Sequence, residues 1–503
     1  MLFISANGAS AASDVIIAVF LVILTLMSFV GLIVCICRFV KSDEGIKNPA
    51  VFFLIVFGVG FALRLVFALC IRGFRDDYAV FSRMFDHLNT DGISGYYAGD
   101  ASVVLYPVVY FIYLIFGGIS NAMGFSQYAL GMQFMVKLPL IIADLLAAFA
   151  VYKIAAKYIN KRVALSLCAF VCICPIFFIG SSLWCTPITF TVMFACLACY
   201  FLARKKHLWT IVFMTAAAFS SKEGIYLFPV ACVFSLYHFV RAIRNILKNS
   251  PKGKALLGSD YIAAITVPVG FVASLVGAYL VGLFMISSYS YNLFTFIYEF
   301  LIAPLVGWSY FTFNGLSVYT IFNQNGSVPS ARFPSWVFAL VFIAIITAVV
   351  CIVYFSKRNR ATLVMLAAYS LFTMQTYYPG STAIGFACVF AVLLAAYALV
   401  RDKRLLMILF ASGLAYVVNT ITALSCAGYL NNLGEYYFGT EQQLLSGNLG
   451  IVGIICSVVT VLSHIYFTVV TVSVGMTGQK KLLEPQRGIM DSIKEFFAIK
   501  KGV

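Results

Sequence analysis

Charged residues are scarce in this chain of 503 residues. Asp, Glu, Lys and Arg together make up 10% of it, whereas soluble proteins carry about 25%. Hydrophobic residues reach 62%, and the mean hydropathy is +0.99. This composition excludes an ordinary water-soluble fold and indicates an integral membrane protein.

Acidic residues are scarcer than basic ones. The chain has 18 Asp and Glu and 34 Lys and Arg, which gives a net charge of +16. A nucleic-acid partner would explain such an excess. However, most of the basic residues lie in short clusters between long apolar runs, as in the cytoplasmic loops of membrane proteins. The charge therefore indicates membrane topology, and no nucleic-acid partner is expected.

Zinc-site and disulfide patterns are also lacking. The 14 cysteines lie almost wholly in apolar segments, and neither Cys-Ile-Cys triplet, at 35–37 and 172–174, has the histidine or second cysteine pair that zinc needs. No metal site or cofactor follows from the sequence, although carboxylates in a water-exposed loop could hold a divalent cation through oxygen ligands.

Apolar runs of spanning length recur along the whole chain. They predict an all-α, polytopic membrane protein with about thirteen transmembrane helices. The first run has no basic flank before it and no small-residue cleavage site, so we expect a retained helix. The thirteen runs are 14–37, 50–71, 134–153, 163–180, 188–203, 208–220, 225–240, 261–286, 336–355, 361–376, 381–400, 405–424 and 449–472.

Seven basic clusters hold 27 of the 34 Lys and Arg residues, and thirteen crossings place all seven on one side of the membrane. Because Lys and Arg concentrate in cytoplasmic loops, the N-terminus is predicted outside and the C-terminus inside. We expect one membrane domain over 1–475 and a basic cytoplasmic tail over 476–503, in a plasma membrane of bacterial type.

Three long loops are then predicted on the outer face, at 72–134, 287–335 and 426–447. The first contains one more apolar run, 103–119. If that run crossed the bilayer, the later basic clusters would change sides. We therefore expect it to lie on or dip into the outer surface.

The first outer loop carries an acidic island. Five of the eighteen acidic residues fall within 72–100. Asp76 and Asp77 come just after the second helix, where a carboxylate reaches both water and the membrane surface. A general base needs a carboxylate within hydrogen-bond reach of the attacking group, and such a loop can supply one. The alternative is a solvated acidic loop without a catalytic role.

The segment from Asp77 to Phe81, followed by Gly92, Tyr97 and Tyr106-Pro107, resembles the first outer loop of the GT-C superfamily of membrane glycosyltransferases. Further likenesses follow in the family's order and span roughly residues 60 to 420. They are Lys137-Leu138-Pro139 with Asp144, Leu183-Trp184, Ser221-Lys222-Glu223-Gly224, and Met374-Gln375-Thr376-Tyr377-Tyr378-Pro379.

Some family charges are missing. Cys185-Thr186-Pro187-Ile188 follows Trp184 where the family has Gly-Gln-x-Asp, and Gln375-Thr376-Tyr377 stand in place of His-Glu-Arg. Three interpretations stay open: a glycosyltransferase, a non-catalytic protein of this fold, and a transporter or flippase of lipid-linked saccharide. No internal repeat supports the transporter.

The resemblance implies a GT-C fold and an inverting transfer from a polyprenyl-phosphate-linked sugar to a glycan, lipid or protein acceptor at the outer leaflet, as in mannosyltransferases of the cell envelope. Asp77 takes the role of base, with Asp76 as its less aligned neighbour. Because a leaving lipid phosphate needs preplaced donors, the expected phosphate and substrate contacts are cations and tyrosines. They are Lys222, Arg332, Arg64, Lys137, Tyr377 and Tyr378.

Overall fold

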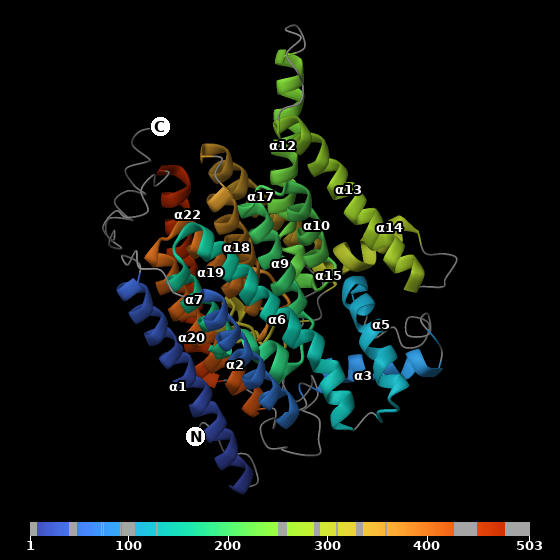
Figure 1. Ribbon diagram of the computed structural model, residues 1–503, viewed down its shortest axis with the longest axis vertical. Coiled ribbons are helices and arrows are strands. Elements are labelled where there is room, and N and C mark those ends of the chain that lie inside the picture. The colour runs from blue at the N-terminus through green and yellow to red at the C-terminus, as the bar shows by residue number, and fades with distance from the viewer. Residues whose placement is uncertain are drawn as a thin grey trace.

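The computed structural model describes residues 8–39, 48–71, 73, 75–90, 92, 106–126, 129–249, 259–285, 292–307, 310–327, 335–357, 360–426 and 450–477. They form a bundle of helices with one long arm at one end, built from α12 and α13 (Figure 1). The predicted tail beyond 477, the third outer loop and Arg332 lie outside the described residues.

Helices make up nearly all of the first half. In chain order they are α1 (Gly8–Phe39), α2 (Pro49–Cys70), α3 (Arg75–Thr90), α5 (Pro107–Ala122), α6 (Leu130–Tyr158), α7 (Lys161–Ile173), α8 (Pro175–Phe178), the π-helix η1 (Ile179–Trp184), α9 (Ile188–Ala203), α10 (His207–Ala218), α11 (Lys222–Ile225) and α12 (Phe228–Asn249).

The second half adds two strands of two residues each, β1 and β2, which pair in parallel. Its elements are α13 (Ser259–Met285), α14 (Leu293–Ile297), η3 (Tyr298–Ile302), α15 (Ala303–Val306), β1 (Thr312–Phe313), α16 (Val318–Ile321), α17 (Ser335–Lys357), α18 (Arg360–Tyr377), β2 (Ser381–Thr382), α19 (Ala387–Val400), α20 (Lys403–Cys426) and α22 (Gly450–Thr477).

The fold is that of an all-α polytopic membrane protein, as predicted, and each of the thirteen apolar runs contains helix, although run 381–400 begins with strand β2 and becomes helical only at Ala387. Seven described helices are long and apolar enough to cross a bilayer by themselves, and an eighth span is the bent pair of α7 with α8 and η1. The remaining runs form shorter helices or helices that this test does not include, so thirteen crossings stay a prediction.

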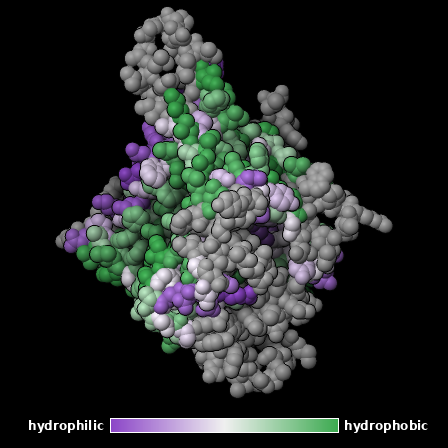
Figure 2. All heavy atoms as spheres, turned by 90° about the vertical axis from the view of Figure 1, so that its right-hand side faces the viewer, coloured by the Kyte–Doolittle hydropathy of each residue, from purple (hydrophilic) through white to green (hydrophobic). Residues whose placement is uncertain are grey.

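The predicted apolar runs correspond to two kinds of helix, those buried on every side and those that face lipid, and both kinds are hydrophobic around most of their surface. All fourteen residues of α19 are buried, so its apolar surface faces other helices on every side. In contrast, α1 and α2 expose large side chains such as Ile16, Phe20 and Leu54, as lipid-facing helices do. On the face shown in Figure 2, hydrophobic residues cover most of the described surface and hydrophilic ones occur in small groups.

The predicted straight run 163–180 is instead broken, and the two parts meet at 55°. Pro175 begins the second part. Proline has no N–H to donate to the carbonyl four residues earlier, which is Val171, so the break leaves carbonyl oxygens in a region without water.

Arg64 of α2 satisfies these carbonyls. Its guanidinium donates to Val171 O at 3.1 Å and Cys172 O at 2.5 Å, and its Nε lies 3.2 Å from Asp144 Oδ2 on α6. Ser181 of η1 donates to the same carboxylate oxygen. Arg64 and Asp144 are 0% and 3% exposed. This buried network joins α2, α6 and both halves of the bent pair.

The first outer segment packs at the end of the bundle where α2 ends and α6 begins (Figure 1). Its helices α3 and α5 share an aromatic cluster with α6 and α9, in which the Phe81 and Tyr113 rings stack at 4.2 Å. Tyr113 also donates to Val136 O on α6 at 2.6 Å. These contacts fix α3 against the rest of the bundle.

Removing the carboxylate of the buried network should strongly destabilise the fold. Asp144→Leu leaves the Arg64 cation buried without its counter-charge, which costs about 3–5 kcal/mol. The free energy of unfolding, measured by denaturant titration in mixed micelles, should fall by that amount. The double variant Arg64→Met/Asp144→Leu should recover part of the loss, and a single variant within about 1 kcal/mol of wild type would contradict the role of the pair.

Candidate functional site

Gly73 positions the chain that leaves α2. Its φ is +127°, a conformation that favours glycine, and a Cβ atom there would lie 2.7 Å from Cys185 Cβ and 3.2 Å from Trp184 O. The backbone at residue 73 therefore rests directly against the turn that follows η1. This close approach sets where α3 begins.

Asp77 lies in the first turn of α3 and is half-buried. It is near enough to Cys185 for an electrostatic interaction with the thiol. The N-terminal end of a helix favours a carboxylate, because the peptide dipoles point their positive end toward it. Asp76 belongs to the same turn, but its side chain lies outside what the structure describes.

Lys137 of α6 lies on the other side of the Cys185 turn. It is fully buried, and its ammonium donates to the carbonyls of Ile71 and, at 2.6 Å, Ser182. Gln133, one turn earlier, donates to Ile71 O at 3.0 Å. Lys137 thus ties the end of α2 to the end of η1, and its charge also acts on the Cys185 thiol.

Arg64, another predicted phosphate contact, is deeper still. It stands seven residues before Ile71, about 10 Å along the helix, and its guanidinium binds Asp144 and backbone carbonyls. The structure therefore places Arg64 and Lys137 in the internal framework, away from any surface that a lipid phosphate could reach. The physical reason is that both cations satisfy carbonyls at helix ends inside the bundle.

Lys222 lies in the turn between α10 and α12. Gly224 allows this turn, because a Cβ atom there would lie 1.8 Å from Ala217 O. The half-buried Lys222 donates its ammonium to the carbonyl of Gly380, just before β2. Ser221 and Thr191 share a hydrogen bond of 2.8 Å, which anchors the turn to α9.

Tyr377 and Tyr378 belong to the same turn as Gly380. Tyr378 is buried and donates its hydroxyl to Leu305 O, while the Tyr377 carbonyl accepts from the Tyr319 hydroxyl at 3.0 Å. Lys222 therefore contacts the turn that carries the two tyrosines, and the Tyr378 hydroxyl is used within the protein.

Glu223 follows Lys222 in the same turn. It is 2% exposed and lies close enough to the phenols of Tyr106 and Tyr226 to interact with them electrostatically. Burial, followed by the Glu223 charge, raises the pKa of Tyr106 well above its usual range. The signal in the sequence was a carboxylate beside a lysine in an otherwise apolar stretch.

Gln375 occupies the position where the resemblance expects a charged block. It is 1% exposed, and neither its Nε2 nor its Oε1 atom has a hydrogen-bond partner among the described residues. The amide stands against Gly385, whose carbonyl accepts from the Cys388 thiol, and Cys388 in turn interacts with Glu223. Gln375 and Glu223 therefore share one neighbourhood.

The site consists of two groups of residues. In the first, Asp77 and Lys137 both interact with Cys185. In the second, Glu223 interacts with Cys388 and Gln375 lies against Gly385, while Lys222 contacts the nearby Gly380. The start of α9 joins them, because Phe190 packs on Tyr113 in the aromatic cluster and the next residue, Thr191, binds Ser221. The backbone also joins them, through Val108 N donating to Phe219 O at 3.4 Å.

In the described part of the chain, no group of three or more His, Cys, Asp or Glu side chains could hold a metal ion. The arrangement offers instead a half-buried carboxylate, a half-buried ammonium, and a buried carboxylate with an unpaired amide nearby. Such a set can accept a proton, bind an anion and hydrogen-bond a polyol.

Residues 125–271 match the family model of the dolichyl-phosphate-mannose-protein mannosyltransferases. The matched region contains Lys137, the Cys185 turn and Ser221–Gly224, and Asp77 precedes it. No curated protein matches the chain. The match covers less than a third of the chain, and together with the all-helical membrane architecture it supports a membrane protein that is similar to mannosyltransferases of the GT-C type.

Proposed function

We propose that the protein transfers a sugar from a polyprenyl-phosphate-linked donor to a glycan, lipid or protein acceptor on the outer face of the membrane, in assembly of a cell-envelope glycan. The observation that carries this proposal is the placement of Asp77. The carboxylate stands half-buried at the N-terminal end of α3, beside the end of α2, and the aromatic cluster holds that helix.

Asp77 acts as the general base in this proposal. The acceptor hydroxyl gives its proton to the carboxylate, and its oxygen attacks the anomeric carbon of the donor sugar. The bond from that carbon to the phosphate oxygen breaks, and polyprenyl phosphate leaves. A single displacement of this kind inverts the anomeric carbon.

Lys222 stabilises the leaving phosphate. An ammonium group has three donors, and the hydrogen bond to Gly380 O uses one of them. Lys222 is also the half-exposed cation of the site, whereas Arg64 and Lys137 are fully buried. Arg332 remains a predicted phosphate contact.

Glu223 and Gln375 bind hydroxyls of the transferred sugar. A buried amide with both polar atoms unpaired is costly unless a ligand satisfies it. A carboxylate accepts from hydroxyls and an amide both accepts and donates, so this pair matches the alternating donors and acceptors of a hexose.

The role of Asp77 is tested with the purified protein and a panel of polyprenyl-phosphate sugars. Asp77→Asn should lower the release of polyprenyl phosphate by about 10²–10⁴-fold, because the amide cannot take the proton. Asp86→Asn, an exposed carboxylate on the same helix, is the matched control and should keep the wild-type rate. An unchanged rate in Asp77→Asn would refute the assignment.

The same assay separates the alternative functions. Wild-type protein that moves a lipid-linked saccharide across a membrane without releasing polyprenyl phosphate would be a transporter. Folded protein that does neither with any donor in the panel would favour the non-catalytic interpretation.

Lys222→Met should lower kcat/KM for the lipid donor by roughly 10²-fold, because a preplaced donor to the leaving oxygen is lost. Lys205→Met, an exposed cation in the turn between α9 and α10, serves as control. The measurement is the initial rate against donor concentration. Equal kcat/KM in the two variants would exclude Lys222 as the phosphate ligand.

Glu223→Gln and Gln375→Leu should each lower the rate by about tenfold or more, since a hydrogen bond to a charged or otherwise unpaired buried group is lost. Both variants should also discriminate less between the natural sugar donor and a deoxy analogue. Glu299→Gln, an exposed carboxylate on η3, is the control. Unchanged discrimination in both variants would place sugar recognition elsewhere.

A further inference from the structure

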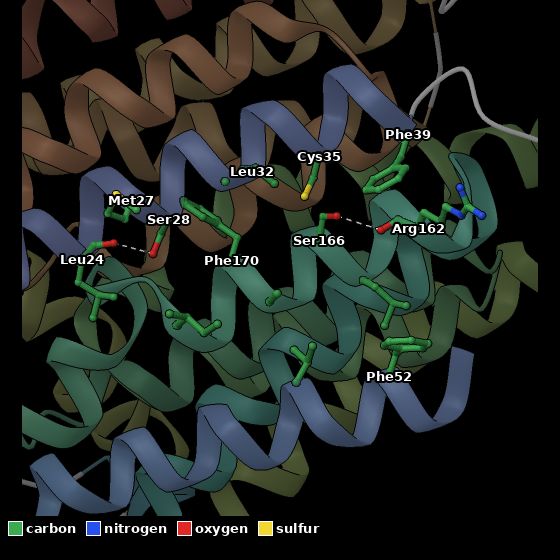
Figure 3. A pocket seen from close by; sticks show the side chains of 15 residues that line it. Leu24, Met27, Ser28, Leu32, Cys35, Phe39, Phe52, Arg162, Ser166 and Phe170 are labelled. Atoms are coloured by element: carbon green, nitrogen blue, oxygen red, sulfur yellow. Dashed lines mark hydrogen bonds between the residues drawn. The ribbon is translucent and has the colours of Figure 1, made fainter. Parts of the chain in front are cut away.

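A long apolar groove lies between α1 and α2, away from the site described above, with α7 as its floor (Figure 3). Its volume is about 1110 Å³. It runs along the helices, with Leu24 near one end and Phe39 and Arg162 near the other (Figure 3). The helices that border it carry exposed apolar side chains, so the groove faces the hydrocarbon of the bilayer.

The groove exists because α1 and α2 touch at one end. Near that end the Phe20 and Phe67 rings lie 6.5 Å apart. Farther along α1, Phe29 packs on Phe170 of α7 at 4.8 Å and on Phe410 of α20 at 4.9 Å, and α2 does not fill the space beside it. The groove thus begins below the Phe20 contact and extends toward Phe39.

The lining suits hydrocarbon. Most of its side chains are aliphatic or aromatic. Its two serines, Ser28 and Ser166, donate their hydroxyls to carbonyls of their own helices, at 2.7 and 3.0 Å. Their polar groups are therefore satisfied without a ligand, and an acyl chain can lie against them at no cost in unpaired hydrogen bonds.

The end near Phe39 is cationic. The Arg162 guanidinium stands 5.4 Å from the Phe39 ring centroid, and that of Arg38 stands 6.0 Å from the same ring. Lys161 is exposed beside Arg162 at the start of α7. Clusters of basic residues at the ends of membrane helices attract anionic headgroups.

We propose that this groove binds one anionic phospholipid from the leaflet on the Arg162 side, with its acyl chains along α1, α2 and α7 and its phosphate on the cationic end. The lipid fills the space between α1 and α2, and α2 carries Arg64 and the end that leads to Asp77. This site is separate from the proposed donor site, because the groove reaches the Phe52 end of α2, whereas Asp77 follows the opposite end and Lys222 lies between α10 and α12.

The groove is tested by filling it. Gly31 lines the groove, and a Cβ atom there meets nothing within 4 Å, so Gly31→Leu occupies the groove without disturbing the fold. Gly58→Leu, at an equally open glycine on α2 outside the lining, is the matched control. Native mass spectrometry after release from nanodiscs of phosphatidylglycerol and phosphatidylcholine counts the retained lipids.

Wild type and Gly58→Leu should each retain one phosphatidylglycerol molecule per protein molecule, and Gly31→Leu should retain none. Equal retention by Gly31→Leu and Gly58→Leu would overturn the proposal, as would wild-type protein without retained lipid. If wild-type protein is released as a dimer and Gly31→Leu is released as a monomer, the groove would instead bind a second copy of the protein. Stronger retention of an added polyprenyl phosphate than of phosphatidylglycerol would assign it to the donor lipid.

The headgroup contact is tested by charge. Arg162→Gln should lower the preference for phosphatidylglycerol over phosphatidylcholine by roughly fivefold, the effect of one basic residue at an anionic membrane surface. Arg204→Gln is the matched control, since Arg204 stands over the Tyr200 ring at 5.2 Å, outside the lining. Loss of preference in both variants, or in neither, would contradict the assigned headgroup site.

Discussion

The buried Arg64 guanidinium holds together the helices that position the site. In hydrocarbon every backbone carbonyl needs a partner, and Pro175 removes the donor that Val171 would have had. Arg64 supplies that donor, and Asp144 balances the charge that it brings. Pro175 bends the α7–α8 pair, and the Arg64 cation then ties α2 to the freed carbonyls and to Asp144, which binds Ser181 of η1.

Above this network, the site is assembled by close backbone contacts. Gly73 lets the chain leaving α2 touch the Cys185 turn, and Gly224 lets the Lys222 turn close on Ala217. Lys137 then fixes the distance between α2 and η1 by binding a carbonyl of each. Because these contacts involve backbone atoms, they leave Asp77 and Lys222 little freedom, as the proposed catalytic roles of these residues require.

The departures from the GT-C pattern have a structural counterpart. Ile188 replaces the acidic residue expected after Trp184, and Lys137 nearby satisfies its charge with two carbonyls and needs no carboxylate. Gln375 replaces part of a charged block, and it leaves an unpaired amide close to the buried Glu223. Relative to that pattern, the proposed site has neutral residues where charged ones are expected, and it keeps a half-buried carboxylate, Asp77, and a half-buried cation, Lys222.

The sequence by itself determined the features that depend on local composition. Apolar runs between polar breaks predicted the helices, the acidic residues after the second run marked the first outer loop, and the resemblance to the GT-C superfamily picked Asp77 from its five carboxylates. Only the tertiary structure decided the roles of Arg64, Lys137 and Glu223, and only it produced the groove beside Gly31. The physical reason is that a charge in a membrane protein takes its role from the partner that neutralises it. Here the partners on other segments, Asp144 and several carbonyls, lie 45 to 108 residues away in the chain for Lys137 and Arg64, so no spacing in the sequence reveals them.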